Sequence, residues 1–311
     1  MEPTRLPALS RVGVTNIEKV TRVGPRGAEQ LYYAKLDCFV ELGPAQNDTS
    51  TSRFQDVVND VIGEVALGAG GFKVEQLAEQ IAVEVRERQG ALRAEVTIAA
   101  RYPEYTPAAV SGIATQEIFT LLGSAVASER GTRRLVGVRA QGMTACPCAQ
   151  QLVAGRSRER LAGDGFGEDQ ITAIFAAVPV ATHNQRGLGT LHLGLPEGCD
   201  TDVDAAVLLA IVEDSMSSEI YELMKRSDEG AVVEKAARRP RFVEDCVREA
   251  IRGALERFGD LRDDAFLSAR QENLETIHQH NVVAERFGLL GELRRELDAG
   301  HHTTMREWLD A

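Results

Sequence analysis

Two cysteines, Cys146 and Cys148, flank Pro147 in the stretch "GMTACPCAQ", and their spacing raises the question of reactive thiols. The proline restricts the preceding backbone and favours an extended Cys146. A helix beginning here would favour the thiolate, the form that binds metals and attacks electrophiles. The spacing is tighter than in ordinary structural zinc pairs, and a disulfide between these positions would be strained. The motif therefore indicates either a functional thiol or two buried, inert cysteines.

Histidines supply a second set of candidates. His183 lies in the polar stretch "ATHNQRG", just before a strand-like segment. Glu275 and His278 lie in "ENLETIHQH" and would share a face in a helix, whereas in a strand His278 would share its face with His280. A satisfied surface or core histidine is the alternative for each. Cysteine, histidine and glutamate near separate element ends favour a metal site.

Acidic residues complete the set. The segment 217–240, "SSEIYELMKRSDEGAVVEKAARRP", is dense in charge and places Glu219 and Glu234 at expected element ends. The alternative is a helix face that only contacts solvent. Cys38 and Cys246 fall within strand and helix patterns, so we expect both in the core.

The composition limits the class of protein. The chain has 311 residues, of which 43% are hydrophobic and 26% charged, as in globular proteins with a full core. Its net charge of −12 and the absence of a basic stripe argue against nucleic-acid binding. The longest apolar run, "AAVLLAIV" at 205–212, is too short to span a membrane, and the N-terminus lacks a secretory apolar segment. The odd number of cysteines favours a reducing compartment, so we expect a cytoplasmic protein.

Periodicity predicts the elements that must position these residues. The first half reads as strands, two helices and strands, at 11–23, 30–43, 53–68, 73–90, 91–102 and 111–128. The second half reads as strands 133–145 and 186–195, helices 202–216 and 240–259, a strand at 265–280 and a helical tail at 285–311. Pro240 is expected at the first helical position. This order predicts an α+β fold on antiparallel sheet, with one unit at 1–130 and a second at 131–311. A helical pair at 149–180 interrupts the second unit.

Four motifs together resemble the GTP cyclohydrolase IB family. They are "TACPCAQ", "ATHNQRG", "SSEIYELMKRSDEGAVVEKAARRPRFVED" and "ENLETIHQH", and the resemblance runs from about residue 10 to 290. It implies the tunnelling fold, with two tandem ββααββ units, antiparallel sheets and helices on one face. It also implies homotetramers with active sites at subunit interfaces. The long link between "CPC" and "THNQR" resembles the archaeal, methanopterin-pathway branch.

The resemblance also implies roles for individual residues. Cys146, His183 and Glu219 match the residues associated with the metal, and Glu234 matches the carboxylate that anchors the purine ring. Cys148, Glu275 and His278 match residues that line the catalytic pocket.

Phosphate-binding residues are less sharply indicated. Arg186, Lys225 and Arg226 are candidates for holding the triphosphate of GTP. Arg53, in "TSTSRF", is a weaker candidate for a phosphate contact. Ser227 and Gly230 depart from the family pattern, which usually has proline and a bulkier residue there.

The expected chemistry is metal-dependent hydrolysis of GTP. One divalent metal per site, Fe²⁺ in preference to Zn²⁺ or Mn²⁺, would activate water for attack on guanine C8. The ring would open, formate would leave, and His278, oriented by Glu275, would move protons. The product would be a 7,8-dihydroneopterin 2′,3′-cyclic phosphate or triphosphate for pterin or folate biosynthesis. The alternatives are a non-catalytic metal-binding or sensing protein, or another pterin enzyme of the tunnelling fold.

Overall fold

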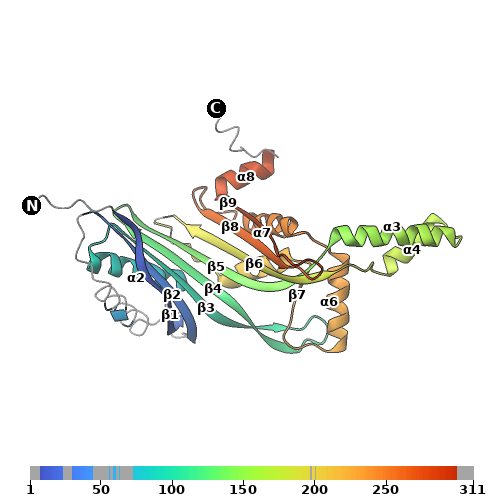
Figure 1. Ribbon diagram of the computed structural model, residues 1–311, viewed down its shortest axis with the longest axis horizontal. Helices are drawn as coiled ribbons and strands as arrows, with labels where there is room; N and C mark the ends of the chain where they lie inside the picture. Colours follow the sequence, from blue (N-terminus) through green and yellow to red (C-terminus); the bar gives the residue numbers. More distant parts are fainter. Residues whose placement is uncertain are drawn as a thin grey trace, which may run out of the picture.

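The fold is built on one antiparallel sheet. The computed structural model describes residues 8–23, 30–44, 73–196, 198–199 and 201–299, together with positions 56, 59, 60 and 63. Its strands are β1 (Leu9–Val23), β2 (Gln30–Leu42), β3 (Arg93–Pro107), β4 (Ala114–Ser128), β5 (Gly131–Ala145), β6 (Asn184–Leu195), β7 (Ser218–Glu219), β8 (Phe266–Leu274) and β9 (Val282–Leu289). Eight of these nine strands follow the order β1-β2-β3-β4-β5-β6-β8-β9, and the ninth, the short β7, pairs with β5 (Figure 1).

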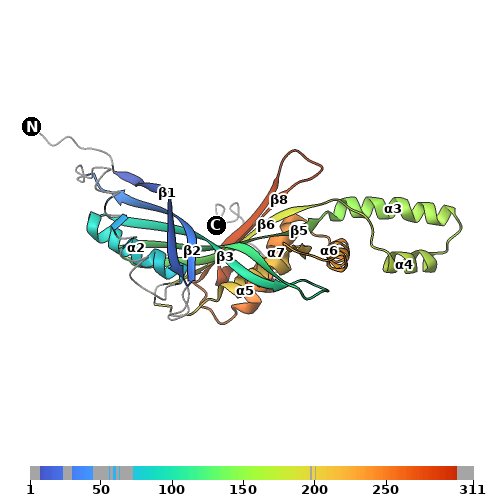
Figure 2. The ribbon, with the colours of Figure 1, turned by 90° about the horizontal axis from the view of Figure 1, so that it is seen from below.

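The helices that form the core lie on one face of this sheet. The described helices are α2 (Val74–Gln89), α3 (Pro147–Gly163), α4 (Glu168–Ala177), α5 (Ala205–Ser215), α6 (Arg226–Arg238), α7 (Val243–Arg257) and α8 (Leu290–Ala299). Helix α2 contacts β3 and β4, α5 contacts β5 and β6, and α7 contacts β8 and β9. Figure 2 shows α2 and α5 on the same side of the strands. The predicted α+β class, with antiparallel strands and helices on one face, is confirmed.

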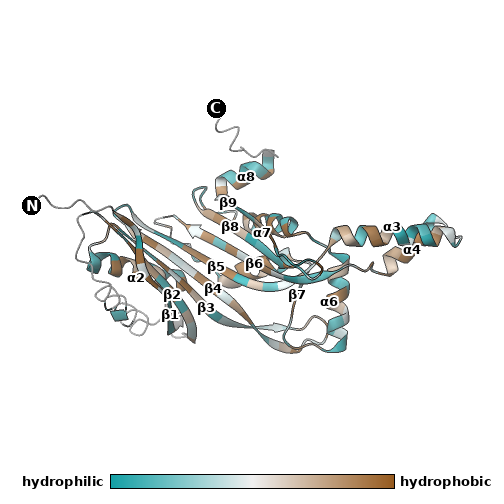
Figure 3. Cartoon of the chain, in the orientation of Figure 1, coloured by the Kyte–Doolittle hydropathy of each residue, from teal (hydrophilic) through white to brown (hydrophobic). Residues whose placement is uncertain are grey.

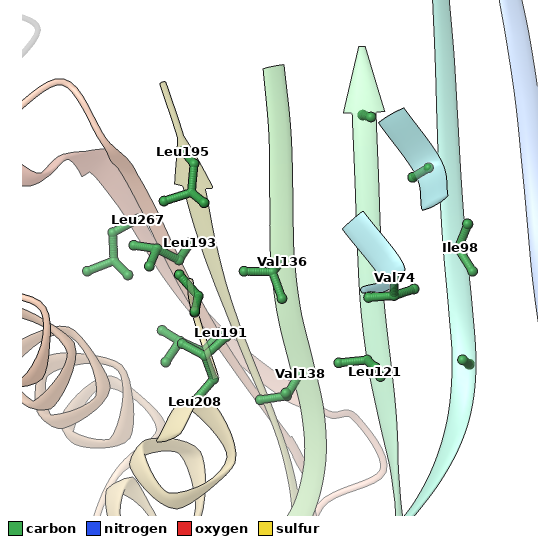
Figure 4. Packing of buried hydrophobic residues seen from close by; sticks show 14 of the residues in the cluster. Val74, Ile98, Leu121, Val136, Val138, Leu191, Leu193, Leu195, Leu208 and Leu267 are labelled. Carbon is green, nitrogen blue, oxygen red and sulfur yellow. The ribbon is translucent and has the colours of Figure 1, made fainter. Parts of the chain in front are cut away.

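Alternation along the strands creates the core between sheet and helices. Apolar and polar positions alternate along several strands in Figure 3, as expected when only one face is buried. Val136 and Val138 of β5 point to the same side as Leu191 of β6, towards Leu208 of α5 (Figure 4).

One close contact fixes how α5 meets the sheet. Met216, directly after α5, lies over Gly142 of β5 and Gly187 of β6. A Cβ atom at Gly142 would lie 2.5 Å from the Met216 Cε, and one at Gly187 would lie 3.1 Å from its sulfur. Any side chain at Gly142 would therefore force the buried Met216 side chain to shift, so glycine suits this close approach of the helix end.

The two halves of the chain share the sheet without a break. β4 and β5 are antiparallel partners from Ser128↔Gly131 to Thr120↔Arg139. The division at residue 130 remains a prediction, because a continuous sheet crosses it. The predicted helix at 53–68 and the residues 300–311 lie almost entirely outside the described residues.

The sheet opens where β4 parts from β5. Residues 114–119 of β4 pair with β3 but not with β5. Opposite them, Gly142 and Met143 of β5 pair with Glu219 and Ser218 of β7. The β3–β4 hairpin thus diverges from β5, and the segment around β7 borders the resulting gap.

Three sequence-based boundaries were wrong. α7 begins at Val243 and not at Pro240, because the Asp245 carboxylate accepts the Phe242 backbone N–H at 3.0 Å and caps the helix there. The strand predicted at 265–280 ends at Leu274. The predicted helical tail begins with a strand, β9, whose residues alternate in exposure, and the helix starts only at Leu290.

Two further features bear on the predicted organisation. Helix α6 lies between α5 and α7, within the segment 217–240 for which a solvent-facing helix was the alternative interpretation. The helical pair expected at 149–180 is present as α3 and α4. Among the described helices, none has the length and apolar character needed to cross a membrane.

A buried carboxylate fastens α6 to the hairpin. Asp228 accepts the backbone N–H groups of Val110, Ser111 and Lys225 at 2.8 to 2.9 Å, and the Ser111 hydroxyl at 2.7 Å. The hydrogen bonds from Ser111, supplemented by those from Lys225 and Val110, hold the pKa of Asp228 well below its ordinary value despite burial. The turn between β3 and β4 is thereby fixed to the start of α6.

We expect Asp228→Asn to lower the Tm at pH 7, because one carboxylate oxygen becomes an N–H₂ group facing backbone donors. Asp228 has a depressed folded-state pKa, so its stabilisation is present above the ordinary value of 3.8 and disappears as the pH falls. The Tm difference from wild type should shrink towards pH 3, whereas the exposed control Asp260→Asn should show little difference throughout. Equal Tm values for wild type and Asp228→Asn at pH 7 would contradict this role.

Candidate active site

Cys146 stands at the junction between β5 and α3. It is the N-cap of α3, and its sulfur accepts the Ala149 backbone N–H at 3.5 Å. Pro147 opens the helix, as the sequence suggested. Cys146 is half-buried, while Cys148 is exposed on the first turn of α3. Cys38 and Cys246 are buried in the core as predicted, and burial raises the pKa of each to about 12.

Backbone contacts bring His183 beside Cys146. The Cys146 N–H donates to the His183 carbonyl at 3.1 Å. The Thr182 hydroxyl donates to the Cys146 carbonyl at 2.7 Å. Because Ala145 and Asn184 are the last partners of β5 and β6, the next residues outward are Cys146 and His183. Two residues that are 37 positions apart are therefore held side by side.

A buried amide orients the His183 ring. His183 Nδ1 lies 3.1 Å from the Gln185 Oε1, and Gln185 is 5% exposed. With the amide oxygen as acceptor, Nδ1 carries the proton and Nε2 keeps its lone pair. This is the arrangement in which outer hydrogen bonds prepare a histidine to bind a metal.

Glu219 lies on the same face of the sheet but is held by other groups. Glu219 pairs with Gly142, four residues before Cys146. Because side chains alternate along a strand, the side chains of Glu219 and Cys146 face the same side of the sheet. Its carboxylate accepts the Tyr221 hydroxyl at 2.9 Å and forms an ion pair with Lys235. Burial raises the pKa of Glu219, but hydrogen bonds from Lys235, the backbone and Tyr221 outweigh it, and the net pKa is lowered.

The structure therefore brings together part of the predicted metal set. Cys146 and His183 are adjacent, whereas the Glu219 carboxylate is engaged with Lys235 and Tyr221. In the part of the chain that the structure describes, no three His, Cys, Asp or Glu side chains are grouped closely enough to hold a metal ion. The three-ligand set remains a prediction.

A cavity of about 570 Å³ occupies the gap in the sheet. Arg101 and Arg186 line it together with Glu117, Glu213 and Tyr221. The cavity therefore carries two positive groups that could contact a phosphate and three groups that could exchange protons.

The four phosphate candidates are not alike. Arg186 lines the cavity and donates to the Gln141 side-chain oxygen at 3.0 Å. Lys225 and Arg226 are exposed at the start of α6, outside the cavity wall. Arg53 lies outside the described residues.

Glu213 is the most perturbed carboxyl among those that line this cavity. Burial, followed by the nearby charges of Glu219, Asp214 and Glu117, raises the pKa of Glu213 to about 7. A carboxyl with this pKa can give or take a proton near neutral pH.

The remaining predicted residues lie further out. Glu234 is inside α6, not at an element end as predicted, and its exposed carboxylate pairs with Arg238 at 2.8 Å. Residues 275–280 form a bend between β8 and β9, so neither the helical nor the strand arrangement of Glu275 and His278 is found. The rings of His278 and His280 are stacked, with centroids 5.2 Å apart. The catalytic roles of these residues remain predictions.

Two arginines, one at the end of α6 and one shortly after it, connect the ends of two other helices to this region. Arg238 donates to the carbonyls of Ala176 and Ala177, at the end of α4. The Arg241 side chain donates to the carbonyls of Asp214 and Ser215, at the end of α5, at 3.0 and 2.7 Å.

The backbone of the same segment reaches β5. The Arg241 N–H donates to the Ala145 carbonyl at 3.0 Å, directly before Cys146.

Comparison with known sequences agrees with this geometry. A family model described as type I GTP cyclohydrolase folE2 matches residues 1–284. This chain belongs to the type I GTP cyclohydrolase family.

Individual relatives match this member of the family over nearly its whole length. It is 36% identical over 303 residues to the GTP cyclohydrolase MptA of Methanococcus aeolicus, covering 95% of this chain and 97% of the relative. It is 37% identical over 298 residues to the GTP cyclohydrolase MptA of Methanoculleus marisnigri, covering 94% of each. The resemblance to the archaeal-type family is confirmed.

Solved structures confirm the fold of this family member. The uricase from Arthrobacter globiformis superposes with a TM-score of 0.50 over 98% of both chains, at 9% identity. A hyper-thermostable uricase variant gives a TM-score of 0.52 at 8% identity. At such low identity the likeness concerns the tunnelling fold alone.

Sequence reasoning missed several residues that shape this site. Gln185 could have been found, because it lies two positions from His183 and so shares its strand face. Lys235 and Glu213 could not, because their partners come from other elements. Arg238 and Asp228 likewise acquire their roles only through contacts distant in sequence.

We expect Glu213→Gln to flatten the decline of Tm with rising pH. The folded-state pKa of Glu213 is raised from 4.5 to about 7, so its stabilising contribution is complete below pH 4.5 and is lost as the pH rises through 7. Glutamine is neutral throughout and avoids that loss. Thermal unfolding from pH 4.5 to 8 tests this, with Glu222→Gln, an exposed neighbour, as the control. Parallel Tm curves for wild type and Glu213→Gln would contradict the burial of an ionisable carboxyl here.

Proposed function

We propose that this chain hydrolyses GTP, opens the imidazole ring of guanine at C8 and releases formate. The observation that carries the proposal is the pairing of Cys146 with His183 by backbone hydrogen bonds in a member of the type I GTP cyclohydrolase family. The MptA relatives, named as GTP cyclohydrolases, support GTP as the substrate.

The paired thiol and imidazole suit a divalent metal. Thiolate and imidazole together favour Zn²⁺ or Fe²⁺, and Mn²⁺ is compatible if a carboxylate joins them. Cys146 and His183 would hold the ion, and Glu219 would join them once released from Lys235. A bound divalent metal supplies a water molecule that is readily deprotonated near neutral pH. We propose Fe²⁺ as the preferred ion.

The chain's own residues orient the substrate and move protons. With its side-chain oxygen as acceptor, Gln185 would keep the proton of His183 on Nδ1, and Arg186 offers a guanidinium to a phosphate oxygen in the cavity. Glu234 would accept N1–H and the 2-amino group of guanine in a bidentate pair. Glu213 and Tyr221 lie in the cavity wall, where a group with a pKa near 7 can exchange protons with the opening ring. His278, together with Glu275, stays a candidate for a second proton transfer.

The proposal extends to the product and the assembly. The α3–α4 insertion resembles the methanopterin-pathway branch, which favours a 7,8-dihydroneopterin 2′,3′-cyclic phosphate over the triphosphate. Among the described strands, β1 and β9 each pair on one side only. Val20 on β1, and Val283 and Phe287 on β9, are exposed apolar side chains at these edges. Both features support a homotetramer that closes the sheets into a barrel.

The decisive experiment measures formate released from GTP under anaerobic conditions, with the metal-free protein reloaded with Fe²⁺, Zn²⁺ or Mn²⁺ in turn. We expect the highest rate with Fe²⁺, and mass spectrometry of the pterin identifies its phosphate. A protein that binds these metals but leaves GTP unchanged would instead be a metal-binding or sensing protein.

We expect Cys146→Ala to lose both metal binding and formate release, because the thiolate is removed from the only cysteine held against His183. Cys246→Ser, in the core, serves as the matched control and should keep both. Metal content is measured by elemental analysis and folding by circular dichroism. Full metal occupancy and turnover in Cys146→Ala would refute the assignment.

We expect Glu234→Ala to reduce kcat/KM for GTP by a factor on the order of 10² to 10⁴, with unchanged metal content. Inosine triphosphate keeps N1–H but lacks the 2-amino group, so the variant should also lose most of the preference for GTP over inosine triphosphate. Glu229→Ala, on an exposed turn of the same helix, is the control. Activity of Glu234→Ala within a few fold of wild type would exclude Glu234 as the purine anchor.

A further inference from the structure

The Arg238 side chain connects the C-terminal end of α6 to the end of α4. Its Nε donates to the Glu234 Oε1 at 2.8 Å. Its two terminal nitrogens donate to the carbonyls of Ala176 and Ala177 at 3.1 and 3.2 Å. One guanidinium thus holds the proposed purine anchor and the last residues of α4 at the same time.

This arrangement differs from an ordinary ion pair on a helix surface. An exposed pair four residues apart contributes only about 0.3–0.5 kcal/mol and leaves both side chains free to move. Here the Arg238 guanidinium donates to the Glu234 carboxylate and to the carbonyls of Ala176 and Ala177. These two carbonyls lie at the end of α4 and have no partner within their own helix. The planar fork fixes its three acceptors relative to one another, so the Glu234 carboxylate has a defined direction.

The α3–α4 hairpin depends on such contacts because it has little core of its own. None of the α3 residues is buried, and Ile171 is the one buried residue of α4. Figures 1 and 2 show the hairpin extending away from the sheet. The Gln150 amide adds two further links near its base, to the carbonyls of Val180 and Ala237 at 3.1 and 2.6 Å. These links and those of Arg238 meet at the C-terminal end of α6.

We propose that Arg238 is a positioning residue for purine recognition, through which the α3–α4 hairpin sets the direction of the Glu234 carboxylate. The inference rests on the proposed function, in which Glu234 accepts the N1–H and 2-amino groups of guanine. A carboxylate turned away from that plane accepts one of these groups and loses the other. The hairpin therefore contributes to the choice between guanine and a purine without the 2-amino group.

Steady-state kinetics of the metal-loaded enzyme test this, with GTP and inosine triphosphate as parallel substrates. Arg238→Gln should lower the kcat/KM ratio of GTP to inosine triphosphate on the order of tenfold. The change should come from a higher KM for GTP, with the rate for inosine triphosphate nearly unchanged. Arg238→Lys keeps the charge but cannot serve three acceptors, so it should lower the ratio as well. Arg248→Gln, which removes an exposed arginine paired with Asp245 on α7, should leave the ratio as in wild type.

Hydrogen exchange supplies a readout that does not depend on turnover. Amides at residues 174–180 should exchange faster in Arg238→Gln and Arg238→Lys, while those of α7 should not change. If Arg238→Gln fails to fold, the ratio measured with Arg238→Lys decides the question.

The outcomes separate the two levels of the argument. An unchanged GTP preference in a variant that releases formate overturns the role of Arg238 alone. An equal loss of kcat for both substrates also overturns it, because that marks a general structural defect. Full restoration of the preference in Arg238→Lys shows that charge suffices and overturns the shared-fork geometry. A wild-type protein that releases no formate from GTP overturns the proposed function and this inference with it.

Discussion

Helix ends leave carbonyl groups without partners, and the organisation of this site depends on how those groups are satisfied. Arg238 and Arg241 lie close together in the sequence. Their side chains donate hydrogen bonds to the free carbonyls at the ends of α4 and α5. Positive side chains at these positions also suit the negative end of the helix dipole. Because the Arg241 backbone is bonded to Ala145, the same segment fixes the end of β5. The position of Cys146 therefore depends on two helices to which it is not adjacent in sequence.

Lys235, together with Arg101 and Arg186 of the cavity wall, balances the acidic groups around the cavity. Glu213, Glu219 and Glu117 lie near one another at the gap in the sheet, and their mutual repulsion contributes to the raised pKa of Glu213. Lys235 offsets part of this charge through its ion pair with Glu219. A metal ion that took Glu219 as a ligand would replace the lysine as the neutralising charge. In the proposed function, metal binding would therefore be coupled to the protonation of Glu213 through the Glu219 carboxylate.

Local patterns in the sequence were enough to predict the strands and the helices that bury one apolar face. β3 alternates strictly in burial along its first half, and α7 has an apolar face, so both could be read from periodicity. The "CPC" motif indicated a strand-to-helix junction because proline suits a first helical turn. The start of α7 was misplaced because a side-chain cap from Asp245 competes with the proline signal. The tail was misassigned because β9 is short, charged and half exposed.

The site itself was predictable only as a list of residue types. Motif resemblance supplied Cys146 and His183, and the register of β5 and β6 shows that they are adjacent. The engagement of Glu219 with Lys235 could not be foreseen, since it depends on where α6 packs. Nor could the cavity, which exists because residues 114–119 of β4 pair with β3 but not with β5.

The contact of Met216 with Gly142 and Gly187 also opposes incorrect register in β5 and β6. A strand that slips by one residue turns all its side chains to the opposite face. Such a slip in β5 would bring Met143 to the place of Gly142, and one in β6 would bring Arg186 or Leu188 to the place of Gly187. Each of these side chains would have to displace the buried Met216 side chain. Sheets with a shifted register are therefore disfavoured by steric clashes several residues away from the Cys146 thiol. The register that places Cys146 beside His183 is thus favoured by the fold itself, before any ligand binds.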